Sequence, residues 1–210
     1  MNKKSNLILL PVFIILGIVA LQIPFTKIIG STQKFSLFDF IAPVAGGFLG
    51  SGLGFISIVA VKIFELIFSH KVLDLTTILR LLPLPLAALY FGSKSKLRAI
   101  IPVVCMILFI SHPQGRQAWY YSLYWLFPIA DSFINKFKSL GATFTAHAVG
   151  SVVFLYAFNL QAAVWKSLIP VVAIERLQFA LGIWLSYKAG MWLVKKLKNI
   201  NFGRFNVLSR

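Results

Sequence analysis

The sequence is poor in the residues that build catalytic and metal centres. Among 210 residues it holds one cysteine, three histidines and five acids. Cys105 has no second cysteine for a disulfide, and the scattered histidines and acids do not have the ligand spacing of a zinc site. No HExxH, GxSxG or Walker A motif is present. We therefore expect no metal site and no cofactor, and a protein that is not an enzyme.

Charged residues are also scarce. They make up 12% of the chain, against 59% hydrophobic residues, whereas soluble domains carry about 25% charged residues. Several continuously apolar runs approach or exceed the roughly 18 residues of a membrane helix, without the alternation of barrel strands. The composition predicts an all-α, polytopic helical membrane protein with six to eight membrane helices, forming one integral membrane domain over residues 1–210.

The few charges are unequally divided, with 21 Lys and Arg against five acids and a net charge of +16. In a soluble protein this excess of positive charge would suggest that the protein binds nucleic acid. Here the basic residues gather in loops and at the C-terminus, as the positive-inside rule requires, so the lipid bilayer is the expected partner and nucleic acid is not. The apolar N-terminal segment lacks a small-residue cleavage site, which favours a retained helix over a signal peptide.

Apolar runs, prolines and basic turns place the expected helices along the chain. Pro83 and Pro85 predict a kink in the fourth of them. A polar connector is expected over 26–36, a basic turn over 93–98 and a basic cytoplasmic tail over 195–210. The eight helices are expected near 7–23, 37–49, 55–69, 76–92, 98–111, 118–133, 142–159 and 168–194.

The stretch 35–68 is longer than one span requires and has glycines near its middle. Counting membrane crossings back from the basic C-terminus places the N-terminus outside if this stretch is a single helix. A folded-back pair of short helices within 37–69 places it inside, in agreement with the two lysines near the N-terminus. We therefore predict a turn within 50–54 and a chain whose two termini are both cytoplasmic.

Small residues recur at four-residue spacing in three stripes. This spacing lets membrane helices approach closely. Packing inside the protein is the simpler explanation of any one stripe, and docking of a partner subunit stays open for one of the three. The stripes are Gly46/Gly50/Gly54, Ala142/Ala146/Gly150 and Gly182/Ser186/Gly190.

Several charges interrupt the apolar runs. Charged groups inside membranes are costly and tend to be functional. Mutual pairing is one interpretation: Lys62 and Glu65 are three residues apart and can pair on one helix, whereas the adjacent Glu175 and Arg176 are expected to find different partners. An outward-facing polar pocket for a small ligand is the other. On the predicted topology the charges on the outer side are Asp39, Lys62, Glu65, Arg80, Arg116, Glu175 and Arg176.

The segment 112–121 adds His112, Arg116, Trp119 and Tyr120. An interfacial aromatic belt explains its Trp and Tyr residues without any ligand. The alternative is an aromatic platform for a flat ligand, with Arg116 as an anion clamp or a cation–π partner.

One face of the expected helix 142–159 carries Thr143, His147 and Ser151. We expect His147 to hydrogen-bond to a neighbouring helix. A proton relay is the alternative, although no acid lies near His147 in the sequence.

The residues Phe38-Asp39 through Pro43 and Gly46-Gly47 to Gly54, followed by an apolar helix with Lys62, resemble the substrate-binding (S) components of energy-coupling-factor transporters. Leu168-Ile169-Pro170 leading into Glu175-Arg176 is similar to the start of that family's last helix. The resemblance implies a small basic membrane protein that captures a vitamin-like or other small molecule from outside. It also implies a transmembrane coupling subunit and two cytoplasmic ATPases as partners. The family usually has six helices and an AxxxA stripe in the first, which is missing here.

Together these features predict a membrane substrate-binding subunit in a prokaryotic plasma (inner) membrane, with several membrane crossings. The alternatives are a non-catalytic membrane scaffold of an envelope complex and an intramembrane lipid-modifying enzyme that uses His112, His147 or Glu175. The residues predicted to bind the ligand are Asp39, Lys62, Glu65, Arg80, His112, Arg116, Trp119, Tyr120, Glu175 and Arg176.

Overall fold

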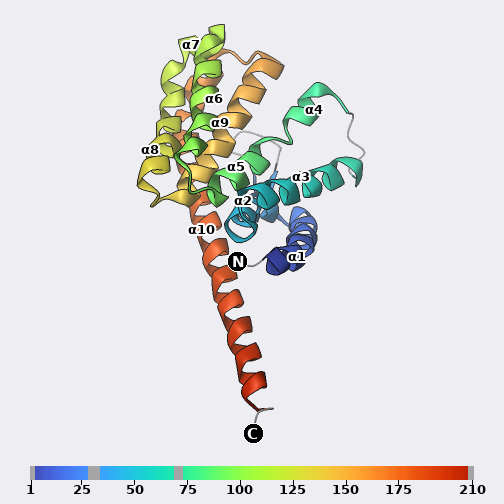
Figure 1. Ribbon diagram of the computed structural model, residues 1–210. Helices are drawn as coiled ribbons and strands as arrows, with labels where there is room; N and C mark the ends of the chain where they lie inside the picture. Colours follow the sequence, from blue (N-terminus) through green and yellow to red (C-terminus); the bar gives the residue numbers. More distant parts are fainter. Residues whose placement is uncertain (1–2, 28–33, 69–72, 208–210) are drawn as a thin grey trace.

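The computed structural model describes residues 3–27, 34–68 and 73–207, and helices dominate it (Figure 1). The α-helices are α1 (Lys3–Leu21), α2 (Leu37–Leu49), α3 (Ser51–Phe68), α4 (Leu75–Leu79), α5 (Pro83–Gly92), α6 (Ile100–Ser111), α7 (Pro113–Gln117), α8 (Leu126–Ile134), α9 (Lys138–Phe158) and α10 (Ala162–Val207). Two 3-10 helices, η1 (Lys96–Ala99) and η2 (Trp119–Trp125), and two short strands, β1 (Pro24–Lys27) and β2 (Lys34–Ser36), complete the described elements. The predicted all-α class is confirmed.

Within the described residues, three helices are long and apolar enough to cross a membrane. Their spans are Ser51–Phe68, Lys138–Phe158 and Ala162–Lys196. Shorter apolar helices cover Leu9–Leu21, Leu37–Leu49 and Thr77–Gly92. These helices agree with a membrane protein, and the number of six to eight crossings stays a prediction.

The stretch 37–68 is divided into two helices at a single glycine. Gly50 lies between α2 and α3 with φ +84°, a conformation that glycine adopts without steric cost. Just beyond the turn the helices touch, because a Cβ added to Gly54 would lie 2.5 Å from the Cα atom of Gly46. The predicted break is confirmed, but the turn is narrower than 50–54, since Gly52 and Gly54 belong to α3.

Two expected helices have a different form in the structure. The segment 76–92 is not kinked but broken, with α4 ending at Leu79 and α5 beginning at Pro83, where the missing N–H of proline costs no hydrogen bond. The segment 118–133 begins as the 3-10 helix η2 and becomes α-helical only at Leu126, and Pro128 then falls in the first turn of α8.

The termini of the other segments also differ from expectation. The last helix begins at Ala162 and runs to Val207, so it includes most of the expected tail. The expected polar connector contains the strands β1 and β2, which pair antiparallel with Thr26 opposite Phe35. The middle of this connector, 28–33, lies outside the described residues.

Close contacts at glycines hold α2 at the centre of the molecule. A Cβ on Gly46 would lie 1.9 Å from the carbonyl oxygen of Ala88 in α5. On the other side of α2, added Cβ atoms on Gly182 and Gly190 of α10 would lie 2.1 Å and 2.8 Å from the rings of Phe40 and Phe48. These small residues are therefore occupied by contacts inside the protein.

One member of the predicted stripes differs from the others. Gly50 does not pack against another helix, because a Cβ added there would meet no atom within 4 Å, and its role is to form the turn. Ser186 is half-buried, as Gly182 and Gly190 are, and its predicted role in helix packing or partner docking stays a prediction. The two phenylalanine rings lie against the glycines, so the close approach of α10 to α2 occurs one helical turn on either side of Ser186.

Candidate functional site

A cavity of about 460 Å³ lies between α2, α3, α5, η2, α9 and α10. Five residues predicted to bind a ligand line it, and they come from segments far apart in the sequence. Aromatic rings from the same elements form much of the remaining wall. The charged residues are Asp39, Lys62, Arg80, Glu175 and Arg176, and the aromatic ones are Phe35, Tyr121, Phe154, Trp165 and Phe179.

The fold at Gly50 brings the first two charges together. Asp39 lies 11 residues before Gly50 (50 − 39) and Lys62 lies 12 after it (62 − 50), yet both line the cavity, so α2 and α3 fold back on each other. Asp39 Oδ2 accepts hydrogen bonds from the backbone N–H (2.7 Å) and hydroxyl (3.0 Å) of Ser36, which caps α2. Lys62 forms an ion pair with Glu65, which lies beside the cavity wall rather than in it.

Arg80 enters the cavity from the end of α4. Asp74 caps this short helix by accepting the backbone N–H of Thr77 at 2.6 Å, and the hydrogen bonds from the Thr77 hydroxyl and backbone hold the pKa of this exposed carboxyl below its usual range. The Arg80 guanidinium lies 4.9 Å from the ring centroid of Phe154 and 5.3 Å from that of Phe158. Within the described residues it makes no ion pair, although its charge also helps to lower the pKa of Asp74, and its exposed side chain can meet an anionic group.

Glu175 and Arg176 contact each other, and the expectation of different partners was wrong. Arg176 Nη2 donates to Glu175 Oε2 at 3.3 Å, and Nη1 donates to the hydroxyl of Thr143 at 3.4 Å. The long arginine side chain folds back over the ring of Phe179, 4.5 Å from its centroid. Its Nε–H is buried and has no acceptor among the described residues. An unsatisfied buried donor of this kind costs roughly 1–3 kcal/mol.

A hydrogen-bond chain from η2 to α9 fixes the direction of the Tyr121 hydroxyl. Trp125 Nε1 can only donate, so the Nδ1 atom of His147 accepts at 3.1 Å. In the neutral ring the proton is then on Nε2 and is donated to the Tyr121 oxygen at 2.7 Å. The hydroxyl hydrogen of Tyr121 is left for Ser151, 3.4 Å away, or for a solute in the cavity.

These contacts confirm that His147 bonds to a neighbouring element. Among the described residues its ring bonds to Tyr121, Trp125 and Ser151 and to no acid. A proton relay through this histidine therefore has no carboxylate at its end. Tyr121 and Trp165 were not predicted as site residues, because nothing in the sequence distinguishes them from the other aromatics of the chain.

The remaining predicted ligand residues lie away from the cavity. Trp119 and Tyr120 are 51% and 37% exposed, and Arg116 is exposed at the end of α7. His112 caps α7 by accepting the N–H of Gln114, and its ring lies against Tyr156. With three residues per turn, the 3-10 helix directs Tyr121 inward and leaves the two aromatics before it outside.

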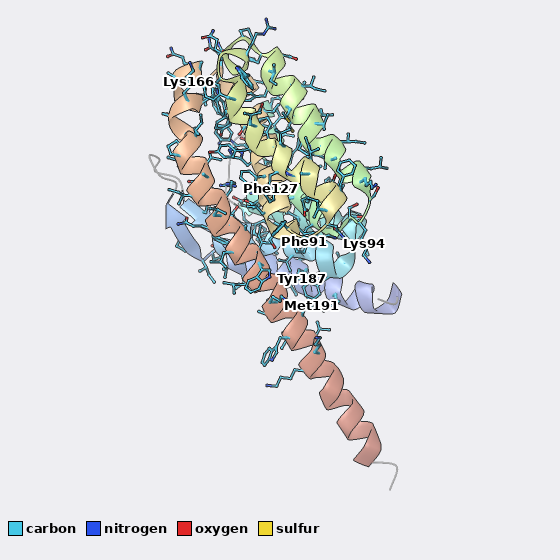
Figure 2. The ribbon with its side chains drawn as sticks, turned by 90° about the vertical axis from the view of Figure 1, so that its left-hand side faces the viewer. Phe91, Lys94, Phe127, Lys166, Tyr187 and Met191 are labelled. Carbon is cyan, nitrogen blue, oxygen red and sulfur yellow. The ribbon has the colours of Figure 1, made fainter. Side chains whose placement is uncertain are left out.

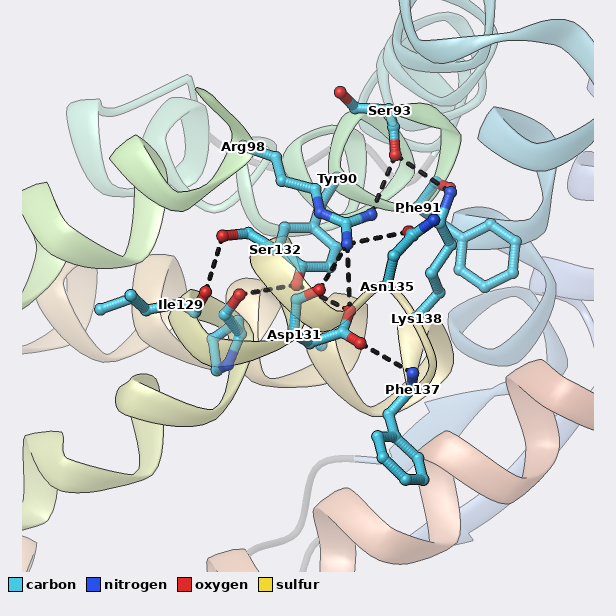
Figure 3. A network of polar contacts seen from close by, with 12 residues as sticks. Tyr90, Phe91, Ser93, Arg98, Ile129, Asp131, Ser132, Asn135, Phe137 and Lys138 are labelled. Atoms are coloured by element: carbon cyan, nitrogen blue, oxygen red, sulfur yellow. Dashed lines mark hydrogen bonds and ion pairs between the residues drawn. The ribbon is translucent and has the colours of Figure 1, made fainter. Parts of the chain in front are cut away.

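A second polar centre, which sequence reasoning missed, joins the ends of α5, η1 and α8 (Figure 3). Arg98 and Asp131 form an ion pair at 3.3 Å, and their side chains are 0% and 1% exposed. Arg98 Nη2 also donates to the backbone carbonyl of Asp131 (2.8 Å) and to the amide oxygen of Asn135 (3.0 Å), while Nη1 donates to the carbonyl of Ser93 (2.9 Å). Sequence analysis identifies Arg98 only as part of the basic turn over 93–98.

The carboxylate of Asp131 accepts further hydrogen bonds besides that of Arg98. The backbone N–H of Phe137 donates to it at 2.7 Å, and the single hydroxyl hydrogen of Tyr90 is shared between this carboxylate (3.1 Å) and the carbonyl of Pro128 (2.7 Å). The guanidinium of Arg98 lies 4.7 Å from the centroid of the Tyr90 ring. Neither charge lines the cavity, and the pair connects helix ends, so its role is to hold the helices together.

Comparisons of this chain with protein-family models, with curated proteins and with solved structures gave no match. In the part of the chain that the structure describes, no three His, Cys, Asp or Glu side chains gather in a way that could hold a metal ion. The charged cavity is therefore the candidate functional site on its geometry alone.

Proposed function

We propose that this chain is the solute-binding subunit of a membrane transport system. It crosses a prokaryotic plasma membrane several times, keeps both termini in the cytoplasm and captures a small solute from outside. A transmembrane coupling subunit and separate cytoplasmic ATPases supply the energy, since the sequence has no ATP-binding loop. The observation that carries the proposal is the gathering of five charges from distant segments around one cavity.

The cavity wall indicates the chemistry of the solute. Arg80 has no ion pair within the described chain, and the Tyr121 hydroxyl is held as a donor. These donors favour a solute with acceptor oxygens, at least one of them anionic. The aromatic rings around them favour an apolar or planar body, and a volume of about 460 Å³ lies within the usual range for small-molecule sites.

The alternative of a scaffold protein fits only part of the site. A scaffold would have mutually neutralised charges, and the pairs Lys62–Glu65 and Glu175–Arg176 are of this kind. It would need neither the cavity nor a guanidinium such as that of Arg80 among its aromatic rings. A lipid-modifying enzyme has less support, because His112 lies against Tyr156 and does not line the cavity with His147 and Glu175.

Loss of a cavity charge is expected to weaken solute binding. The experiment releases the retained solute from purified wild-type protein by denaturation, identifies it by mass spectrometry and titrates it into unloaded variants. We expect Arg80→Ala to raise Kd by roughly 10- to 100-fold, the effect of losing one hydrogen bond to a charged group, and Lys62→Ala to raise it less, because the Lys62 ammonium is already paired with Glu65. Both variants should insert into the membrane normally, since neither side chain is fully buried.

Arg116→Ala is the matched control, because it removes an arginine that is exposed and lies outside the cavity. Its Kd should equal that of the wild type. Unchanged affinity in both cavity variants would contradict the proposed function.

A further inference from the structure

A second hollow, of about 720 Å³, lies on the side of the molecule where α10 passes the ends of α5 and α8 and the start of α9. Phe91, Lys94 and Tyr187 mark this region (Figure 2). Four lysines line the hollow, and none of its described lining residues is acidic. We call this hollow the basic groove; its lysines are Lys94, Lys136, Lys138 and Lys188.

The basic groove lies where two apolar helices become long enough to have crossed the hydrocarbon core of a bilayer. The 21 residues of α9 span about 30 Å, the thickness of a bilayer core, and Lys138 is the first of them. A three-residue connection (159–161) returns the chain into α10, and Trp184 of α10 lies 22 residues after Ala162, or about 33 Å along the helix. Both helices therefore reach the edge of a hydrocarbon core at the groove, and α10 continues beyond it (Figure 1).

The positive charge of the basic groove is not neutralised by the acid nearest to it in the chain. That acid, Asp131, is buried and paired with Arg98. Lys138 donates to the carbonyls of Ser93 (3.0 Å) and Phe91 (3.4 Å), so it is held against the end of α5. The other three lysines are exposed and carry their charges around the opening.

Aromatic residues complete the basic groove. Trp184 is 48% exposed and Phe137 is 56% exposed, and the Nζ atom of Lys188 lies 5.8 Å from the centroid of the Trp184 ring. Trp and Tyr are typical of the headgroup level of membranes, and lysines at that level attract anionic lipid. A free phosphate ion would use the lysines but not the exposed apolar rings.

We propose that the basic groove binds an anionic phospholipid, with its phosphate among the lysines and its acyl chains along the apolar sides of α9 and α10. The inference rests on the membrane placement given under the proposed function, but not on solute binding. The proposed capture of a solute does not involve this surface.

The test is native mass spectrometry of the purified protein in detergent, titrated with phosphatidylglycerol or with phosphatidylcholine of the same acyl chains. The groove variant combines Lys94→Gln, Lys136→Gln and Lys188→Gln and keeps Lys138, which holds α5. Each lysine near an anionic lipid contributes roughly a fivefold preference. The variant is therefore expected to bind phosphatidylglycerol on the order of 100-fold more weakly, with phosphatidylcholine binding unchanged.

The matched control combines Lys166→Gln, Lys195→Gln and Lys196→Gln, which remove the same charge from exposed positions of α10 outside the groove. It should keep the preference for phosphatidylglycerol. Equal binding of the two lipids by the wild type, an equal loss in the control, or displacement of the lipid by inorganic phosphate alone would overturn the proposal. Solute retention by the groove variant should equal that of the wild type, so failure of the lipid site and failure of the solute site are distinguishable.

Discussion

Replacement of Arg98 by alanine is expected to destabilise the protein by about 3–5 kcal/mol, because it leaves the Asp131 carboxylate buried without its cation. Four hydrogen bonds of the guanidinium disappear at the same time, including those that link η1 to α8. Thermal unfolding in detergent, followed by the intrinsic fluorescence of the tryptophans, measures the effect. For a chain of this size we expect a decrease in Tm of roughly 10 °C.

Lys96→Ala is the control for this prediction, because Lys96 lies in the same basic turn but is exposed. Its effect should stay within about 0.5 kcal/mol, as for most surface changes. The double variant Arg98→Leu, Asp131→Leu should be more stable than Arg98→Ala, since it removes both buried charges. Equal Tm values for Arg98→Ala and Lys96→Ala would show that the ion pair does not hold the helices together.

Gly46→Ala is expected to cost about 3 kcal/mol, the upper part of the range for overpacking. The added Cβ would lie 1.9 Å from the carbonyl oxygen of Ala88 and 2.9 Å from the backbone nitrogen of Gly92. Since both atoms belong to the backbone of α5, no side chain can rotate away, and α2 and α5 must separate. The loss should appear as a lower Tm and as faster proteolysis of the detergent-solubilised protein.

Gly52→Ala tests whether this effect is local. A Cβ at Gly52 meets no atom within 4 Å, and alanine is a better helix former than glycine. The stability of this variant should equal or exceed that of the wild type. If Gly46→Ala were as stable as Gly52→Ala, the close approach of α2 and α5 would not be required by the fold.

The sequence predicts those features that a strong physical constraint imposes. A run of 34 residues (35–68) is too long for one membrane span, so a break at its glycines follows from length and from the charge count, and the structure has that break at Gly50. The same topology predicts that charges from several helices lie at one level. Asp39, Lys62, Arg80, Glu175 and Arg176 do line one cavity.

Features that depend on tertiary contacts cannot be predicted from segment length and charge count. Arg98 stands in the sequence Ser93-Lys94-Ser95-Lys96-Leu97-Arg98, and only the fold reveals that it turns inward to Asp131 while Lys96 stays exposed. The aromatic run 119–125 contains several adjacent candidates, and its 3-10 geometry decides that Tyr121 faces the cavity. The pairing of Glu175 with Arg176 likewise depends on how the arginine side chain folds against Phe179.

The four-residue spacing of small residues also predicts the helix contacts only in part. It marks positions where helices can approach, and Gly182 and Gly190 do lie against α2. The spacing cannot say which member of a stripe carries the contact, because that depends on where the partner helix places its large side chains.

The central claim is that the charged cavity holds a small solute, and blocking the cavity tests it most directly. Gly150 lines the cavity, and a Cβ there would meet only Pro83, at 3.8 Å, so a larger side chain has room to grow into the space. Gly52→Phe is the control, because it adds the same side chain where no atom lies within 4 Å and outside the cavity.

The measurement is the amount of small molecule, per mole of protein, that mass spectrometry finds in purified wild type, Gly150→Phe and Gly52→Phe. We predict one solute at close to one mole per mole in the wild type and in Gly52→Phe, and its loss from Gly150→Phe with little change in Tm. An empty wild-type protein, or a solute retained equally by Gly150→Phe, would contradict the assignment of this cavity as the binding site.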